Sequence, residues 1–378
     1  MRIKTVMWCV ALGCSGLLAC NGDLRGSGTD AAGSGGGTDA GSMSLPGDAA
    51  ADARPRGPDS GSRGADAASA PPMEDAWTAP PMPTHLCAMP RPSGAPMPAP
   101  LAAYSGGACP ALVPGSNTVT TSGASRTFIL VVPTDAREGE RLPVSFLWHP
   151  LGSEADVYLT GGVLQDAADR ERFIAVLPQA KGDLTLRWPS TGGGGRVDEE
   201  VRFFDDMLAC VAAQWTVNTD CVATGGVSAG ALWSNRLANA RADRLSSFIS
   251  VSGGTGGAFP GWSSVGHRLP ALVIWGGPTD TCGPFSFEGV SRNLTGSLSR
   301  DGHAIIECVH NCGHALPPFE MADPFLPIVQ FGLNHPFWLG RGETPYSAGL
   351  PDTFPSWCGL GAGSATRRTG MCAAPSAC

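Results

Sequence analysis

Residues 221–231 read CVATGGVSAGA: an apolar run typical of a strand, a Gly-x-Ser-x-Gly bend centred on Ser228, and then a segment with helical spacing through Asn239. A strand that turns directly into a helix crowds the backbone and strains the serine, so small residues are needed on both sides. Gly226 and Gly230 meet that need. The bend also places the serine hydroxyl at a helix N-terminus, where backbone N–H groups favour a developing negative charge. The stretch therefore indicates that Ser228 is a nucleophile.

Short apolar runs alternate with helix-length segments on both sides of this bend. The expected strands are residues 127–132, 144–148, 173–177, 221–227, 248–251, 271–275 and 304–309, and the expected helices are residues 159–172, 199–214 and 285–300. Strands this apolar, mostly separated by helices, predict a doubly wound, mostly parallel α/β sheet covered on both faces. We expect one such catalytic domain over residues 101–340. In these sheets, ligands bind beyond the carboxyl ends of the strands, where Ser228 also lies.

The N-terminus has the features of an export signal. Arg2 and Lys4 precede an apolar stretch that is too short to span a bilayer comfortably, which predicts a signal peptide over residues 1–19. Residues 17–20 read LLAC and resemble the bacterial lipobox, so we expect Cys20 to be lipidated. The chain would then be an outer-membrane or cell-surface lipoprotein, or one released outside the cell. The alternative is cleavage elsewhere, with Cys20 an ordinary thiol.

Two further segments flank the expected domain. Residues 20–100 are rich in Gly, Ala, Ser and Pro, which predicts a disordered tether. Residues 341–378 contain three cysteines and little periodicity; they are either an extension stapled onto the domain or a small surface-binding knot.

The net charge is −8 and the expected domain has no basic cluster, which argues against nucleic acid as a partner. We expect a monomer that contacts the membrane only through its N-terminal lipid.

A serine hydroxyl needs an adjacent base, and the base needs an acid to orient it. Asp280 follows the 271–275 strand, and both His310 and His314 follow the 304–309 strand. His314 is favoured as the base, because it lies farther into a loop that must curl back over Ser228. The order Ser, Asp, His is that of the α/β-hydrolase fold.

The loop after the 144–148 strand is expected to complete the oxyanion hole. In this fold one N–H comes from the residue after the nucleophile, here Ala229, and the other comes from this loop. Pro150 has no N–H, so Leu151 is the candidate donor.

Residues 116–335 resemble the secreted esterases grouped with polyhydroxybutyrate depolymerases, feruloyl esterases and acetylxylan esterases. The matching residues are Arg126 to Val132, Leu147 to His149, Trp188-Pro189, Asp198 to Asp206, Thr224 to Gly230, Trp275 to Asp280 and Gly313-His314. The resemblance implies ester hydrolysis through an acyl-enzyme, with Ser228, Asp280 and His314 in the matching positions. The chain departs from it at Pro150, where relatives usually have His-Gly.

The substrate is expected to be a small or polymeric ester, and no sequence feature calls for a cofactor or a metal. Trp188, Trp262, Trp275 and His149 are candidate substrate contacts, although buried core is the commoner fate of tryptophan. Two other functions remain open. A peptidase or acyltransferase would use the same three residues, and a binding lipoprotein would keep the fold without activity.

The chain has 13 cysteines, of which ten remain once Cys9 and Cys14 leave with the signal and Cys20 carries lipid. In an exported protein these are expected to form disulfides. The expected pairs are Cys282 with Cys312, Cys210 with Cys221, and Cys87 with Cys109; a tail cysteine is expected to reach Cys308. The alternative is a zinc ion held by Cys308, Cys312 and His314.

Overall fold

A computed structural model of the chain describes residues 85–319 and 325–372. The expected signal peptide, the lipidation at Cys20 and most of the expected tether lie outside these ranges. Among the helices of the described ranges, none has both the length and the apolar composition needed to cross a bilayer.

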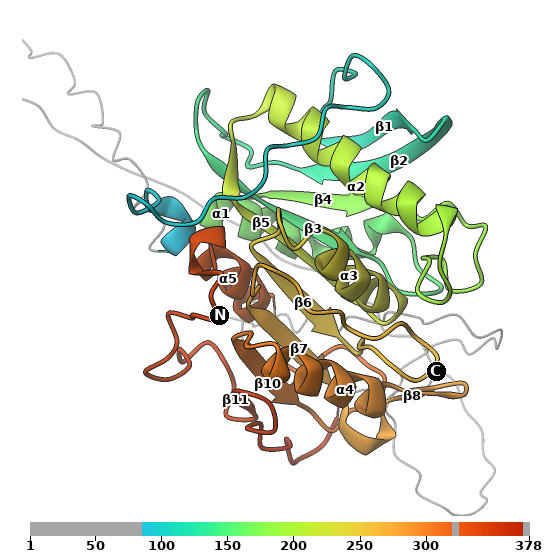
Figure 1. Cartoon of the computed structure of the whole chain (residues 1–378), viewed down its shortest axis with the longest axis vertical. Coiled ribbons are helices and arrows are strands. Elements are labelled where there is room, and N and C mark those ends of the chain that lie inside the picture. Colours follow the sequence, from blue (N-terminus) through green and yellow to red (C-terminus); the bar gives the residue numbers. More distant parts are fainter. Residues whose placement is uncertain (1–84, 320–324, 373–378) are drawn as a thin grey trace, which may run out of the picture. The chain divides into compact units, whose positions relative to one another are not determined.

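In the described residues, nine strands form one twisted sheet in the order β1-β2-β4-β3-β5-β6-β7-β10-β11 (Figure 1). The strands from β4 to β10 in this order run parallel to one another, and β1, β2 and β11 are antiparallel to their neighbours. The strands are β1 (Gly115–Thr121), β2 (Ala124–Val131), β3 (Leu142–Trp148), β4 (Ile174–Pro178), β5 (Val217–Val227), β6 (Ser247–Val251), β7 (Ala271–Trp275), β10 (Ile305–Val309) and β11 (Cys358–Leu360), and a separate hairpin pairs β8 (Thr281–Cys282) with β9 (Phe285–Ser286).

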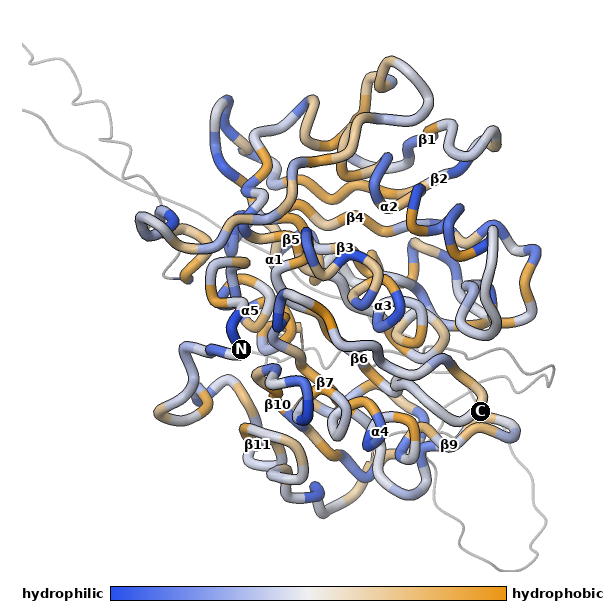
Figure 2. Tube along the Cα trace, viewed as in Figure 1, coloured by the Kyte–Doolittle hydropathy of each residue, from blue (hydrophilic) through white to orange (hydrophobic). Residues whose placement is uncertain are grey.

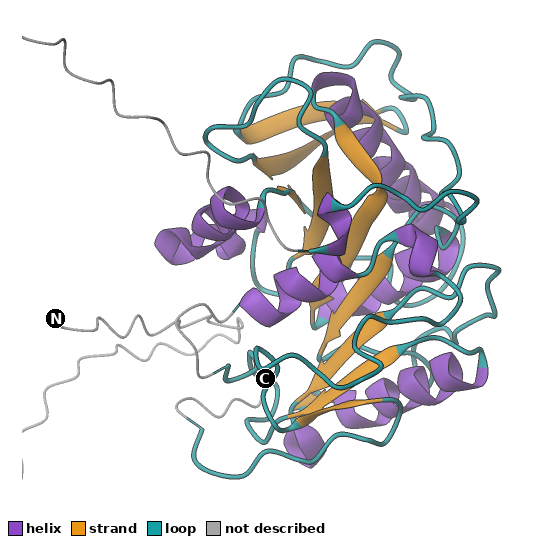
Figure 3. Cartoon of the chain, turned by 90° about the vertical axis from the view of Figure 1, so that its left-hand side faces the viewer, coloured by secondary structure: helices purple, strands orange, loops and turns teal. Residues whose placement is uncertain are grey.

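Helices cover both faces of the sheet, as the turned view shows (Figure 3). The helices are α1 (Val163–Glu171), α2 (Gly195–Gln214), α3 (Ala229–Ala240), α4 (Phe287–Arg300) and α5 (Leu326–Asn334), with short 3-10 turns at Leu86–Ala88, Ala155–Gly162, Gly277–Thr279 and Phe337–Leu339. Helices α2, α3 and α4 pack on one face, and α1 and α5 pack on the other. The predicted doubly wound α/β architecture is therefore confirmed.

The central strands are apolar because both of their faces are covered. Every residue of β4, β6, β7 and β10 is buried, and these strands are largely hydrophobic in Figure 2. Trp148 at the end of β3 packs edge-on against Trp188 and Trp233, with ring centroids 5.0 and 5.8 Å apart. Trp233 belongs to α3, and the backbone of Trp148 passes next to Gly230 in the first turn of that helix.

The edge strand β1 is absent from the sequence prediction because its sequence, GSNTVTT, is mostly polar. Alternate residues of β1 are buried and exposed, as expected of a strand with one covered face. Ser122 and Gly123 connect it to β2 with φ of 49° and 76°, and two positive φ angles match a type I′ hairpin turn.

Residues 85–100, which the sequence assigned to the tether, instead lie against the domain. Arg91 pairs with Asp220 at 2.9 Å, and the Ala99 N–H donates to the carbonyl of Asp243. The segment is Pro-rich and lacks any helical or strand periodicity, and its partners lie more than a hundred residues away, so its sequence does not predict docking.

Three of the expected disulfide pairs are wrong. Cys87 bonds to Cys221 and Cys109 bonds to Cys210, so neither the Cys87–Cys109 nor the Cys210–Cys221 pair forms. The reason is the docked N-terminal segment, which brings each of its cysteines against a buried cysteine of the domain. The third expected pair, Cys282 with Cys312, is treated with the site below.

Two buried histidines are expected to make the folded protein less stable in acid. Burial lowers the pKa of His310 and that of His335 from 6.5 to about 4. Between these pH values the unfolded chain binds protons that the folded protein does not bind, so stability falls as the pH falls from 6.5 to 4. We expect Tm to decline across this window, with each histidine contributing on the order of 3 kcal/mol at about 1.36 kcal/mol per pKa unit.

The variant His335→Gln tests this expectation. In the wild type, His335 donates from Nδ1 to the carbonyl of Phe331 and accepts at Nε2 from the Thr344 hydroxyl. Glutamine does not titrate, so the decline in Tm between pH 6.5 and 4 should become shallower, whatever its Tm at neutral pH. Circular dichroism measures Tm at each pH. If Tm of the variant declines with falling pH as steeply as that of the wild type, His335 does not cause the acid sensitivity.

Candidate active site

Ser228 lies at the junction of β5 and α3 in a strained backbone conformation, with φ 54° and ψ −119°. A Cβ added to Gly226 would lie 2.5 Å from the carbonyl carbon of Gly230, and one added to Gly230 would lie 2.0 Å from the carbonyl oxygen of Trp148. The two glycines of the motif are therefore needed for space. Such strain persists only where the surrounding structure holds it, as it does at functional sites.

The structure brings Ser228, His314 and Asp280 into one hydrogen-bonded triad. The Ser228 hydroxyl donates to Nε2 of His314 at 2.8 Å, and Nδ1 of His314 donates to Oδ1 of Asp280 at 2.7 Å. All three side chains are buried, with exposed fractions of 4%, 2% and 0% for Ser228, His314 and Asp280. In this arrangement the imidazole can take a proton from the serine while the carboxylate stabilises the resulting charge.

The order of the sheet places these residues together. Strands β5, β6, β7 and β10 are successive neighbours and parallel, so their carboxyl ends meet at one edge. Asp280 follows β7 after a 3-10 turn, and His314 lies in the loop after β10. These two loops touch: the N–H of Gly313 donates to the carbonyl of Gly276, and a Cβ on Gly276 would overlap Gly313.

His310, the competing candidate for the base, is not the histidine that bonds to the Ser228 hydroxyl in the described structure, since that partner is His314. The ring of His310 is fully buried and its Nδ1 accepts the N–H of Cys312 at 3.2 Å. Burial lowers its pKa to about 4, so the ring stays neutral in the folded protein near neutral pH. The geometry therefore favours His314 as the base.

The loop after β3 passes next to the start of α3. A Cβ on Gly230 would lie 2.0 Å from the Trp148 carbonyl oxygen and 2.7 Å from that of His149, so the two backbones are in close contact. Ala229 is the first residue of α3, where an N–H has no partner within the helix. The backbones of Ala229 and of the loop that carries Leu151 are thus near each other, as an oxyanion hole requires.

The expected substrate contact by His149 is not supported. Its ring is fully buried, donates from Nδ1 to the carbonyl of Pro150 at 2.9 Å, and accepts the N–H of Ala180 at Nε2. Burial also lowers its pKa, so the ring stays neutral and keeps this tautomer. His149 therefore braces the loop after β3.

Of the tryptophans proposed as substrate contacts, Trp188 and Trp275 are core residues, and Trp262 is partly buried against the core. Trp188 is 1% exposed and donates its Nε1–H to the carbonyl of His149, and Trp275 is fully buried. Trp262 stacks on Phe248 and meets His303 edge-on. Phe248 is near the start of β6 and His303 precedes β10, so Trp262 lies at the opposite end of these strands from Ser228. Large apolar rings bury more surface in these positions than at an open cleft.

The expected Cys282–Cys312 clamp is also wrong, because Cys312 bonds to Cys372. Cys282 is disulfide-bonded, but not to Cys312. The tail was expected to reach Cys308, and the Cys308–Cys358 bond confirms this. Since Cys308 and Cys312 are both oxidised, neither offers a thiolate, and the zinc alternative is contradicted.

The C-terminal extension therefore holds the loop that carries His314. The N–H of Arg368 donates to the carbonyl of Val309, and the Asn311 amide donates to the carbonyl of Gly370. Strand β11, in the same extension, pairs with β10. Of the two structures expected for residues 341–378, the extension stapled onto the domain is the one observed in the described residues.

We expect the double variant Cys312→Ser/Cys372→Ser to lose both stability and activity. The bond closes a loop of 60 residues, which corresponds to about 4 kcal/mol in the chain-entropy model. Since the bond lies two residues from His314, kcat should also fall by at least about tenfold through misplacement of the ring. Urea unfolding and ester hydrolysis measure the two effects.

The matched control is Cys308→Ser/Cys358→Ser, which opens a loop of 50 residues within the sheet. It should cost a similar amount of stability and leave kcat near the wild-type value below its Tm. Equal losses of kcat in the two double variants would contradict a specific effect on the His314 loop.

Two contacts of the triad are not apparent from the motifs. The ring of Phe287, at the start of α4, packs on His314 with centroids 4.3 Å apart, and the Ser252 hydroxyl donates to Oδ2 of Asp280. Ser252 follows directly after the expected 248–251 strand, and this strand-end position was the available signal.

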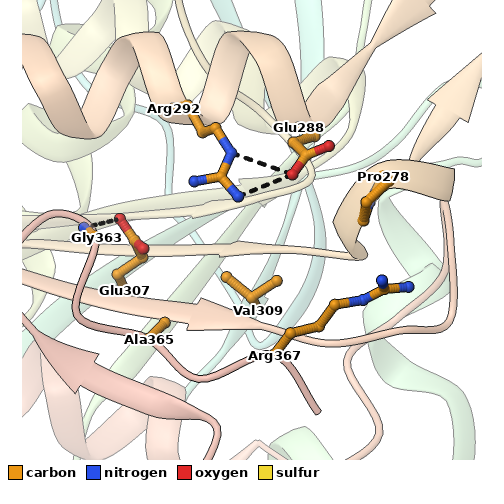
Figure 4. Close-up of a pocket in the computed structure, with 8 residues that line it drawn as sticks. All are labelled: Pro278, Glu288, Arg292, Glu307, Val309, Gly363, Ala365 and Arg367. Carbon is orange, nitrogen blue, oxygen red and sulfur yellow. Dashed lines mark hydrogen bonds and ion pairs between the residues drawn. The ribbon is translucent and has the colours of Figure 1, made fainter. Parts of the chain in front are cut away.

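A small cavity of about 140 Å³ lies between α4, β10 and the C-terminal extension (Figure 4). In Figure 4, Arg292 and Glu288 of α4 face each other and form an ion pair at 2.9 Å. No triad residue lines this cavity, so it is separate from the site around Ser228. The lining residues are Pro278, Glu288, Arg292, Glu307, Val309, Gly363, Ala365 and Arg367.

The mostly parallel sheet, with a strained serine after β5 and an Asp and a His after two later strands, makes this chain an α/β-hydrolase by fold. Among known proteins, it is similar to Feruloyl esterase D of Neurospora crassa, with 31% identity over 173 residues. The match covers 42% of this chain and 57% of the relative, so the chain spans little more than half of that protein. The resemblance to feruloyl esterases expected from the sequence is confirmed.

Solved structures show the same fold. The chain superposes on native sOPH with a TM-score of 0.53 and 18% identity, covering 69% of this chain and 97% of sOPH. For native pOPH the TM-score is 0.52 and the identity 16%, over 68% of this chain and 97% of pOPH. No protein-family model matches the chain.

Proposed function

We propose that this protein is a serine esterase that hydrolyses carboxylic esters through an acyl-enzyme. The observation that carries the proposal is the continuous hydrogen-bonded path from Ser228 through His314 to Asp280, with distances of 2.8 and 2.7 Å. Similarity to Feruloyl esterase D supports ester chemistry over the other reactions that such a triad catalyses. This relative also makes esters of aromatic acids the first substrates to test.

In the proposed reaction, Oγ of Ser228 attacks the ester carbonyl carbon and gives its proton to Nε2 of His314. The backbone N–H groups of Ala229 and Leu151 stabilise the oxyanion of the tetrahedral intermediate. When the intermediate collapses, His314 protonates the leaving alcohol, and the acyl group stays on Ser228. A water molecule then gives a proton to His314 and attacks the acyl carbon; the bond from that carbon to Oγ of Ser228 breaks, His314 returns the proton to Oγ, and the acid is released.

The proposed cellular setting is outside the cytoplasm. Four disulfides join described residues, and such bonds persist in oxidising compartments. The LLAC run at residues 17–20 supports lipid attachment at Cys20 as the anchor. Mass spectrometry of the membrane-extracted protein tests this: a diacylglyceryl mass on an N-terminal Cys20 is expected, and an unmodified mature N-terminus elsewhere would exclude it.

The function is tested with the oxidised mature chain on p-nitrophenyl butyrate and methyl ferulate, beside p-nitroanilide amides and labelling with a fluorophosphonate. We expect both esters to be hydrolysed, the amides to be left intact, and the fluorophosphonate to attach to Ser228. Faster cleavage of the amides would indicate a peptidase. A folded protein that neither labels nor hydrolyses would support the alternative of a binding lipoprotein.

A further inference from the structure

We propose that Ser252 is a positioning residue that fixes the orientation of the Asp280 carboxylate and, through it, that of His314. The proposal rests on the proposed function, because it assigns Ser252 a part in the same reaction. The Ser252 hydroxyl lies 2.8 Å from Oδ2 of Asp280, while Oδ1 faces Nδ1 of His314 at 2.7 Å. Ser252 is 1% exposed.

The two carboxylate oxygens of Asp280 have different partners. Oδ2 accepts from the Ser252 hydroxyl and from the N–H of Gly276, both at 2.8 Å. An ionised carboxylate carries no proton, so the serine must be the donor in this pair. With Oδ2 held by two donors, the carboxylate plane is fixed and Oδ1 is directed at the imidazole. Such hydrogen bonds to an ionised group in a buried site are among the strong ones.

The backbone at Ser252 is strained in a way that a purely structural serine does not need. Its φ is 47°, in the left-handed region that glycine adopts without penalty. The next two residues are glycines, yet the strained position itself is occupied by a serine, whose hydroxyl bonds to Asp280.

Surrounding elements hold the strained turn in place. The N–H of Ser252 donates to the carbonyl of Ile274 on β7 at 2.7 Å. The Ser291 hydroxyl of α4 donates to the carbonyl of Gly253 at 2.7 Å, and the amide of Asn235 on α3 donates to that of Gly254 at 3.2 Å. Strain that neighbours maintain from three sides is the signature of a position kept for function.

The functional consequence follows from the tautomer of His314. Nε2 can accept the Ser228 proton only while Nδ1 carries the other proton and points it at Oδ1. A carboxylate that rotates about its χ2 would exchange its oxygens and weaken this hydrogen bond. By holding Oδ2, Ser252 keeps the base in the reactive state before substrate arrives.

The test compares Ser252→Gly and Ser252→Ala in the full oxidised chain with p-nitrophenyl butyrate. Both variants remove the hydroxyl, but glycine also relieves the left-handed strain, so its Tm should equal or exceed that of the alanine variant. We expect kcat to fall by about 10- to 100-fold in both, as for loss of a hydrogen bond to a charged group, with KM unchanged. A loss of kcat only in the variant with the lower Tm would assign Ser252 a structural part and overturn the proposal.

A double-mutant cycle identifies the partner through which Ser252 acts. In an Asp280→Ala background, Ser252→Gly should cause no further loss, because its only catalytic effect passes through that carboxylate. An equal loss in both backgrounds would overturn the proposal, and so would wild-type kcat in Ser252→Gly. Failure of the function itself is distinguishable, since then the unmodified chain would not hydrolyse the ester.

Discussion

Replacing Ser228 with alanine is expected to lower kcat/KM for p-nitrophenyl butyrate by about 10⁴- to 10⁶-fold, the range typical of a lost nucleophile in a triad. The hydroxyl is the atom that bonds to the acyl carbon, and the described part of the chain places no other hydroxyl within hydrogen-bond distance of Nε2 of His314. Alanine keeps the same backbone strain at φ 54°, so Tm should change little. Initial rates measured with purified variants test this directly.

The matched control is Ser299→Ala, which removes an exposed hydroxyl from α4 and should leave the rate unchanged. Labelling by a fluorophosphonate should disappear in Ser228→Ala and persist in Ser299→Ala. Full labelling of the Ser228→Ala protein would mean that the nucleophile is another residue.

Asp280→Asn is expected to reduce kcat by about 10³- to 10⁴-fold with little change in KM. The reason lies in the donors around Oδ2: Ser252 and Gly276 both donate there, so the amide oxygen of asparagine must take that place. Its NH₂ then faces Nδ1 of His314, which must become an acceptor. The proton moves to Nε2, and the ring can no longer accept the proton of Ser228.

Asp243→Asn is the control, because the Asp243 side chain is 60% exposed. It should retain wild-type kcat. An NMR spectrum of the ring protons of His314 should show Nδ1–H in the wild type and Nε2–H in Asp280→Asn. If Asp280→Asn keeps more than about a tenth of the activity, the tautomer explanation fails.

Much of the fold can be predicted from local patterns. Most positions of the buried parallel strands are apolar, and the predicted helix at residues 285–300 is observed as Phe287–Arg300. The edge strands β1 and β11 escape prediction, because a strand with one solvent-facing side is half polar and β11 has only three residues. A continuous apolar run is expected only of a strand that is buried on both faces, and neither edge strand is one.

Most of the disulfides, in contrast to the central strands, could not be predicted from the sequence. All three cysteine pairs proposed from sequence proximity or loop logic are wrong, because two chain ends far away in sequence return to the domain. Cys87 and Cys109 come from the N-terminal segment, and Cys372 comes from the C-terminal extension. Spacing along a chain says little about such contacts, since the cost of closing a loop grows only slowly with its length.

Local patterns are enough to predict the elbow around Ser228 and the order in which an acid and a base follow later strands, because these depend on local sterics and on the parallel sheet. The packing of loops from separate strands was needed to show that His314 and not His310 bonds to Ser228, that Trp188 is buried, that Trp262 packs against the core, and that Ser252 lies behind Asp280. The physical reason is the distance along the sequence over which each interaction acts. Backbone strain at a turn depends on residues that are adjacent in the sequence. Which side chains share a buried hydrogen bond depends on how loops from separate strands pack together.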